Sequence, residues 1–148
     1  MKLPGCNSKS CPSQIDAKHH QGICPDGWHI PSNADWDKLF RYADGTSGTE
    51  SPYESPTAGR YLKATSGWNS GGNGQDTYEF SALPGGSGGS SGSSSGSFYS
   101  VGNYGIWWSA SEDYSNAAYS RYMEYYYEGA YYKYSVKDVL FSVRCLQD

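Results

Sequence analysis

The chain has 148 residues, which is enough for one domain with a modest core and too few for two. Its formal net charge of -4 offers no positive field for phosphate backbones or anionic lipid, so nucleic acid is not an expected partner. No apolar run approaches the ~20 residues that span a bilayer, so membrane insertion is not expected either. Because the first residues lack the pattern of a signal peptide, we expect any export signal to lie outside this chain.

Residues 1–23 are polar and irregular, which predicts a lead-in before an organised domain at 24–148. The four cysteines are an even number in a Gly/Ser-rich chain, which favours disulfides and an extracellular or cell-surface location. Three pairings are possible, and we favour Cys6 with Cys11 and Cys24 with Cys145. The second bond would stabilise the domain by roughly 4 to 5 kcal/mol, because it closes most of the chain into one loop.

Zinc is the rival interpretation of the first cysteines. Cys6 and Cys11, with His19 and His20, imitate the ligand spacing of a zinc site. A second close-spaced ligand pair is missing from the sequence, so disulfides remain the preferred interpretation.

Two helices are predicted in the first half of the domain. Ser32 can cap a helix over 33–43, with Asp35 three residues later and an apolar stripe of Trp36, Leu39 and Phe40. Gly45 would end this helix. A second helix is predicted from Pro56 to Ala64, with Ser55 as its cap and with Ala58, Tyr61 and Leu62 facing inward.

The second half of the chain predicts short strands separated by polar turns. Every residue from Gly85 to Ser97 is Gly or Ser, which predicts a flexible loop at 85–97 that buries nothing. In the last segment Phe141, Val143 and Cys145 alternate with polar residues, as in a half-buried strand. The predicted strands are 78–83, 106–110, 118–125, 131–134 and 140–145.

Signals for catalysis are poor. The tracts Gly85–Gly89 and Gly92–Gly96 match G-x-S-x-G formally, but no strand and helix flank them, and no paired base is visible. His29, between Trp28 and Ile30, is interpreted as a packed or hydrogen-bonded structural residue. We therefore expect no enzyme activity and no cofactor.

A weak calcium site is conceivable in the Gly-rich turn after residue 68. Asn69, Asn73 and Asp76 supply hard oxygens there, but two of the three are amides. Turn-forming hydrogen bonds are the preferred role for these side chains, and no metal site is expected.

Tyrosine dominates the region from 104 to 134, which holds ten of the fifteen tyrosines. Successive side chains of a strand point to opposite faces, so runs such as Tyr125–Tyr127 must place some rings in solvent. Tyr mixed with Ser, Gly and Asn is the composition of antibody recognition loops. Packing into a β-rich core is the alternative for part of the set, and we favour a recognition surface.

Five ordered stretches carry a resemblance to a known family: Gly22–Ser32, Leu62–Asn69, Phe80–Gly86, Trp107–Glu112 and Phe141–Cys145. They resemble the Fibrobacter succinogenes major paralogous domain family. That resemblance implies an α+β, C-type lectin-like fold with two short helices flanking small antiparallel sheets, stapled by disulfides. Pro31 to Trp36 also resembles the helix entry of formylglycine-generating enzymes, which share this architecture.

The segment 107–140 resembles the variable region of proteins diversified by retroelements, in which template adenines mutate. That resemblance implies fixed positions at Glu124, Lys133 and Lys137 and variable positions between them. With Trp107 and Tyr132 added, the expected ligand contacts are Trp107, Asp113, Tyr114, Ala117, Ser120, Tyr122, Tyr126, Tyr127, Gly129, Tyr131, Tyr132, Tyr134, Ser135 and Val136.

The sequence thus predicts a non-catalytic binding domain of the receptor or adhesin type, monomeric within a larger surface protein, with a protein or glycan as ligand. The lectin calcium motifs Glu-Pro-Asn and Gln-Pro-Asp do not occur in it. One alternative is a module for plant polysaccharide with a platform of Trp68, Trp107, Trp108 and tyrosine residues. Another is an enzyme related to formylglycine generators, which would need an accessible redox-active cysteine pair.

Overall fold

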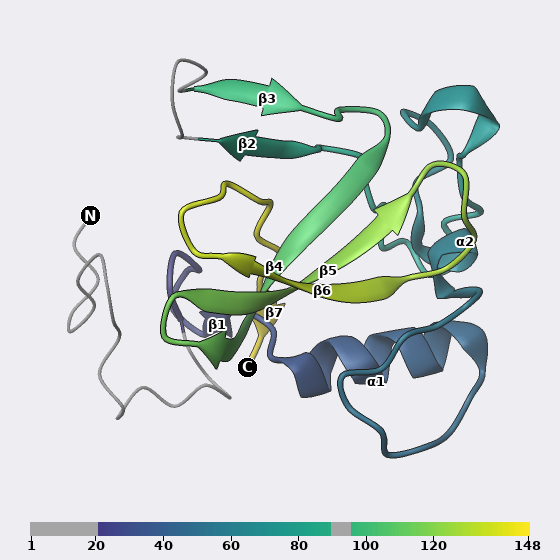
Figure 1. The fold of residues 1–148 in the computed structure, drawn as a ribbon. Coiled ribbons are helices and arrows are strands. Elements are labelled where there is room, and N and C mark those ends of the chain that lie inside the picture. Colours follow the sequence, from purple (N-terminus) through teal and green to yellow (C-terminus); the bar gives the residue numbers. More distant parts are fainter. Residues whose placement is uncertain (1–20, 90–95) are drawn as a thin grey trace.

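The protein, described here from a computed structural model, has an α+β fold (Figure 1). The structure describes residues 21–89 and 96–148, and within them two α-helices and one 3-10 helix accompany seven strands in three antiparallel sheets. Cys6, Cys11, His19 and His20 lie outside these ranges, and so does almost all of the predicted lead-in.

Helix α1 (Asn33–Asp44) confirms the first predicted helix. Ser32 and Asp35 form a reciprocal capping box, in which each side chain accepts from the backbone N–H of the other residue. Gly45 ends the helix with a φ of 72°, a left-handed conformation that glycine adopts without steric cost. Local sequence signals alone are sufficient to set both ends of this helix.

Helix α2 (Ala58–Leu62) is shorter than the predicted 56–64. Its N-cap is Thr57 and not the predicted Ser55, although the Ser55 hydroxyl accepts from the backbone N–H groups of Thr57 and Ala58 just before and at the helix start. Ala58 and Leu62 are buried as expected, and Tyr61 packs at the edge of the core. Residues 69–71 form the 3-10 helix η1 (Asn69–Gly71).

Three strands, β4 (Tyr104–Tyr114), β5 (Ala117–Glu124) and β6 (Tyr131–Val136), form the largest sheet in the order β4-β5-β6. They confirm the predicted strands at 106–110, 118–125 and 131–134, with β4 extended at both ends. The registers pair Trp107 with Arg121 and Tyr122 with Tyr131. Because side chains alternate, one face of this sheet carries Trp107, Arg121 and Met123 toward α1.

The core fills the space between α1, α2 and that inner face. Trp36 and Phe40 from α1 meet Trp107 from β4, with ring centroids of Trp36 and Trp107 6.3 Å apart. The other buried members are Ala43, Tyr53, Ala58, Leu62, Trp68, Ala82, Met123 and Ala130. The core is therefore built largely from aromatic rings and small side chains.

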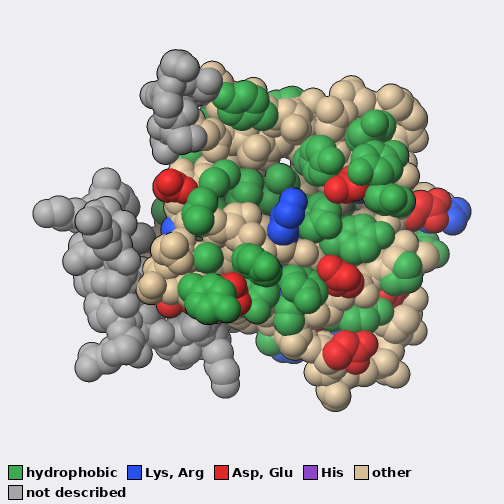
Figure 2. All heavy atoms as spheres, viewed as in Figure 1, with side chains coloured by type: hydrophobic (Ala, Val, Ile, Leu, Met, Phe, Trp, Pro, Cys, Tyr) green, Lys and Arg blue, Asp and Glu red, His purple; other side chains and the backbone are tan. Residues whose placement is uncertain are grey.

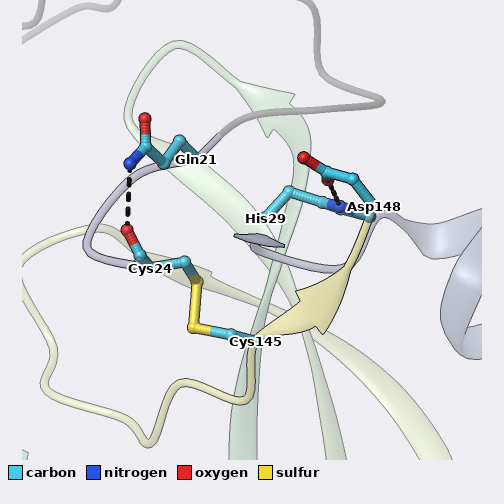
Figure 3. Close-up of a disulfide and its surroundings, with 5 residues drawn as sticks. All are labelled: Gln21, Cys24, His29, Cys145 and Asp148. Atoms are coloured by element: carbon cyan, nitrogen blue, oxygen red, sulfur yellow. Dashed lines mark hydrogen bonds and ion pairs between the residues drawn. A yellow bond between two sulfur atoms is a disulfide. The ribbon is translucent and has the colours of Figure 1, made fainter. Parts of the chain in front are cut away.

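The two ends of the described domain meet in the sheet of β1 (Trp28–His29) and β7 (Leu146–Gln147). The predicted disulfide between Cys24 and Cys145 lies beside it and joins residues 121 positions apart (Figure 3). The Gln21 side-chain amide donates to the Cys24 carbonyl on the same side. The domain is thus closed covalently where its first and last strands pair.

The expected strand at 78–83 does not form, and only Ala82 bridges to Lys63. Glu79 and Ser81 have positive φ values of 55° and 52°, which no strand tolerates. The carboxylate of Asp76 accepts from both the backbone N–H and the hydroxyl of Ser81, so the segment curls back on itself. Local Asx chemistry has overridden a weak alternating pattern.

The start of the Gly/Ser tract is structured, contrary to the prediction that 85–97 buries nothing. Strand β2 (Ser87–Gly89) pairs with β3 (Ser97–Tyr99), and Gly88 also bridges to Leu140. Gly88 is buried, and Leu140 and Phe98 pack closely against it. A Cβ at this position would lie 3.1 Å from the Cβ of Leu140 and 3.4 Å from the Phe98 ring. Glycine is used here for close approach of neighbouring segments.

The expected strand at 140–145 is replaced by isolated bridges. Leu140 bridges to Gly88 and Ser142 bridges to Trp107, but no continuous ladder forms. The alternation is still present, since Phe141, Val143 and Cys145 are half-buried between exposed neighbours. The alternation predicted the half-buried side chains correctly, but the prediction of a continuous strand was wrong.

Candidate functional site: a tyrosine face on the three-stranded sheet

The face of the β4-β5-β6 sheet that points away from α1 carries a continuous group of tyrosines. Tyr104, Tyr122 and Tyr131 lie on it, since the register places Tyr122 opposite both Ile106 and Tyr131 and places Tyr104 opposite Glu124. Tyr126 and Tyr127 join them from the turn that follows β5. We call these five residues the tyrosine face; Figure 2 shows hydrophobic side chains, tyrosine included, gathered over the sheet with charged side chains between them.

The rings of this face touch in series. Ring centroids are 4.5 Å apart between Tyr126 and Tyr127, 6.4 Å between Tyr127 and Tyr131, and 5.6 Å between Tyr131 and Tyr122. These spacings are those of favourable aromatic pairs. Tyr126 and Tyr127 are 54% and 52% exposed, while Tyr122 and Tyr131 are half-buried. The result is an amphipathic strip whose rings hold one another in place.

A buried lysine anchors the turn that carries the two exposed rings. The Lys63 ammonium, which follows α2, donates to the backbone carbonyls of Glu124 at 3.1 Å and of Tyr127 at 2.9 Å. Burial lowers the pKa of Lys63, and the charge of Glu128 opposes that shift. Lys63 therefore joins the helical half of the domain to the position of Tyr126 and Tyr127.

Two carboxylates stand among these phenols. Burial, followed by the negative charges of Glu124 and Glu54, raises the pKa of Tyr122. Burial also raises the pKa of Tyr131, with the Tyr127 phenol and the same two carboxylates as further causes. The pKa of Tyr126 is raised by hydrogen bonds with Glu124 and Tyr104. The pKa values of Tyr122, Tyr126 and Tyr131 are therefore all shifted upward, by burial or by hydrogen bonds.

Glu54 reaches this face through a bridge between segments. Ser55 pairs with Ala130 just before β6, and this places Glu54 beside Tyr131 at the sheet edge. A basic side chain also lies against a ring of this face, since the ammonium of Lys133 on β6 is 5.6 Å from the ring centre of Tyr122. The face thus combines ring surfaces, two carboxylates and one cation.

A second group of side chains lies on the other face of the sheet and toward the turn between β4 and β5; all its members except Tyr119 are predicted contacts. The Tyr119 and Tyr132 rings pack 6.0 Å apart on the other face of the sheet, and Tyr132 also lies 5.8 Å from the Arg121 guanidinium. Burial and a hydrogen bond with Asp113 raise the pKa of Tyr119, and the Tyr114 phenol adds to the shift. Tyr134 and Val136 are exposed on the edge strand β6, with Ser135 half-buried between them. The structure therefore divides the predicted contact set between two faces.

Four predicted contacts lie in the interior and need correction. Trp107 and Ala117 face the core side of the sheet, where Trp107 joins the aromatic cluster. Ser120 is covered because its small side chain lies between Trp108 and Lys133 on the neighbouring strands. Gly129 lies directly beneath the Tyr131 phenol, whose oxygen would be 2.3 Å from a Cβ at that position. All four residues are therefore buried in this structure.

The tryptophan platform of the polysaccharide alternative does not form. Trp68 and Trp107 are only 5% and 6% exposed, and the Trp68 indole N–H donates to the Ala82 carbonyl in the interior. Trp108 is half-buried and packs against Phe141, with ring centroids 4.7 Å apart. Stacking on a sugar requires an open ring face, which the first two rings lack.

His29 is a packed, hydrogen-bonded residue as expected. Its Nδ1 lies 2.6 Å from a carboxylate oxygen of Asp148 (Figure 3). Its Nε2 lies 3.8 Å from a carboxylate oxygen of Asp35. The histidine therefore joins β1 to the capping box of α1 and to the last residue of the chain.

The side chains considered for calcium are used in loop hydrogen bonds. Asn73 accepts from the Trp68 backbone N–H, Asn69 donates to Asn103, and Asp76 accepts from Ser81. Within residues 21–89 and 96–148, no three His, Cys, Asp or Glu side chains converge in a way that could hold a metal ion.

Sequence reasoning missed Tyr104 and Glu54 as members of this surface. Tyr104, Ile106 and Trp108 are alternate residues of β4, so their side chains point to the same face of the sheet. Extending the predicted strand 106–110 by two residues would therefore have placed Tyr104 on this face. Glu54 is placed by the bridge of Ser55 to Ala130, which are 75 residues apart in the chain, and no sequence signal for that pairing exists.

The fold and this surface define the chain as a small α+β domain, closed by a disulfide, with an exposed aromatic sheet face. Neither α-helix in the described part of the chain is long and apolar enough to cross a membrane. The chain belongs to the family of the Fibrobacter succinogenes major domain, whose family model matches residues 13–147. Searches of curated proteins and of solved structures each found no significant match.

Proposed function

We propose that this domain is a non-catalytic binding module of the receptor or adhesin type, and that its tyrosine face contacts a protein or glycan ligand. The observation that carries the proposal is the ring series from Tyr126 to Tyr122, displayed on the solvent side of a sheet whose other side already forms the core. Aromatic rings gathered on a surface are typical of binding sites, because they bury large areas at low entropic cost.

The rigidity of the face supports this role. Lys63 fixes the turn behind the exposed rings, and the remaining rings stand on neighbouring strands. A surface that is already ordered loses little conformational entropy when a ligand binds. This is the condition under which a small aromatic surface gives useful affinity.

We further propose a C-type lectin-like fold, a secreted or surface location and a diversified segment at 107–140. Two helices beside small antiparallel sheets and a terminal strand pair, β1 with β7, support the fold, and the Cys24–Cys145 disulfide supports an oxidising location. An adenine-rich near-copy of this segment and a reverse transcriptase close to the gene would support diversification. A gene region with neither would remove it.

A binding array tests the main proposal. The parent domain and a variant with Tyr126→Ser and Tyr127→Ser are applied to arrays of glycans and of surface proteins. The matched control carries Tyr42→Ser and Tyr78→Ser, because these two exposed tyrosines pack together, with ring centroids 5.0 Å apart, on the α1 side of the domain. We expect parent and control to bind the same array members and the first variant to lose them. Equal binding by all three proteins would overturn the proposal.

A further inference from the structure

The tyrosine face carries a charge pattern that narrows the ligand class. Its ring faces are the negative side of the aromatic quadrupole, Glu124 lies opposite Tyr104 in the sheet, and Glu54 precedes the bridge of Ser55 to Ala130 beside Tyr131. The ring faces and the two carboxylates attract a cation, and both repel sulfated, phosphorylated or other acidic ligands. The net charge of the whole chain, -4, acts in the same direction.

A cation already lies against this face. The Lys133 ammonium is 5.6 Å from the ring centre of Tyr122, within the range in which a cation is attracted to a ring. Lys133 is exposed, and it reaches this position from the neighbouring strand without a hydrogen bond to the ring. The contact of Lys133 with Tyr122 thus shows that a ring of this face can pack against an ammonium group.

From this charge complementarity we propose that the tyrosine face recognises a protein partner through a lysine or arginine side chain. The inference rests on the proposed function and names the ligand chemistry of the same surface. The partner's cation lies over the rings of Tyr127 and Tyr131, where Glu54 and Glu124 balance its charge. The apolar stem of the lysine or arginine side chain packs on the ring series beside it.

Lys133 of the chain itself competes with a ligand cation for this surface. An incoming cation meets the positive charge of Lys133 at the Tyr122 end of the ring series, which weakens its binding. Removing that charge should therefore strengthen binding, whereas removing the charge of Glu124 should weaken it. Opposite effects from two substitutions on one face are a signature that simple disruption of the fold does not produce.

The test uses acetylated tetralysine amide as the probe and the same peptide with every ammonium acetylated as its neutral match. Binding is followed at low salt through the NMR ring resonances of Tyr122, Tyr127 and Tyr131. We expect the charged peptide to shift these resonances saturably and the neutral peptide to leave them unchanged. Glu124→Gln should weaken binding about two- to fivefold, as for an exposed ion pair, and Lys133→Gln should strengthen it by a similar factor.

Glu50→Gln is the matched control, since it changes the net charge by the same amount but lies on the α1 side, where Glu50 pairs with Arg41. Equal weakening by Glu50→Gln and Glu124→Gln would show attraction to the bulk charge and would overturn the inference. An absence of ring shifts, or equal shifts from the neutral peptide, would overturn it too. If the array in the preceding section meanwhile showed Tyr126-dependent binding to a neutral glycan, the proposed function would stand while this inference fell.

Discussion

Arg121 on β5 and Asp37 on α1 form an ion pair in the interior, with the guanidinium Nη2 2.9 Å from Oδ1 of the carboxylate. The guanidinium also donates to the backbone carbonyls of Tyr53 and Asn33, and Asp37 accepts from the Tyr53 backbone N–H. One arginine thereby connects the sheet, the helix and the loop that follows the helix. The two residues of this ion pair, Arg121 and Asp37, are 84 positions apart in the chain.

We predict that Arg121→Met destabilises the domain by about 3 to 5 kcal/mol, because Asp37 is left as a buried charge without its partner. The measurement is the free energy of unfolding in urea. The double variant Arg121→Met with Asp37→Leu should recover part of this loss, since both charges are then removed together. A double variant no more stable than Arg121→Met would contradict the coupling.

The Cys24–Cys145 disulfide closes a loop with a sequence separation of 121. In the chain-entropy model, replacing both cysteines by serine should lower the free energy of unfolding by about 5 kcal/mol. Urea unfolding of the oxidised and the reduced parent provides the comparison, and the reduced parent should match the double variant. A loss below about 1 kcal/mol would show that this bond contributes little.

Gly59 in α2 approaches the loop before β6 so closely that a Cβ there would lie 2.2 Å from the Gly129 carbonyl oxygen. Gly→Ala inside a helix is normally stabilising by about 1 kcal/mol. Here we predict a destabilisation of about 1 to 3 kcal/mol, because backbone must move to make room. Arg60→Ala, at the exposed neighbouring position, is the control and should change stability by less than about 0.5 kcal/mol. Thermal unfolding measures both, and a stabilised Gly59→Ala would refute the close approach.

Lys63→Met should loosen the turn that carries Tyr126 and Tyr127. The substitution leaves the carbonyls of Glu124 and Tyr127 without their donor, which costs about 1 to 3 kcal/mol for buried groups. Larger ring-resonance changes at Tyr127 than at Tyr42 in NMR spectra would show the local effect. Unchanged resonances at both positions would mean that the turn is held by other contacts.

The raised phenol pKa values predict a specific alkaline behaviour. Tyr122 and Tyr131 are raised chiefly by burial, so the folded protein holds these protons to higher pH than the unfolded chain does. Their stabilising contribution is therefore complete below the unfolded pKa of about 10 and is lost as pH rises through the folded values. We expect the free energy of unfolding to fall above pH ~10, and less steeply in Tyr122→Phe with Tyr131→Phe.

Near-ultraviolet absorbance of phenolate measures this directly. In the native protein a fraction of the tyrosines should ionise at higher pH than in the urea-unfolded chain, and the double Phe variant should reduce that fraction. Identical titration curves for the folded and unfolded parent would contradict the environment described for these rings.

Some features of this protein follow from the sequence alone because their causes are local. The capping box of Ser32 and Asp35, the apolar stripe of α1 and the stop at Gly45 act within a few residues, and all were predicted. The Cys24–Cys145 disulfide is not local, since its cysteines lie 121 positions apart; the even cysteine count predicted disulfides, and this bond belongs to the favoured one of three possible pairings. The sequence predicted from strand alternation that some rings of Tyr125–Tyr127 would be exposed; the exposure is confirmed, but its cause is the turn after β5, where Tyr126 and Tyr127 are both exposed.

Tertiary structure alone decided which tyrosines share a face and what surrounds them. The alternation of β5 is visible in the sequence, but its pairing with β6 separates Tyr122 and Tyr131 from Tyr119 and Tyr132. Glu54 joins the first pair only through the bridge of Ser55 to Ala130. Such contacts depend on how distant segments pack around the Arg121–Asp37 pair, and a local pattern contains no information about a partner dozens of residues away.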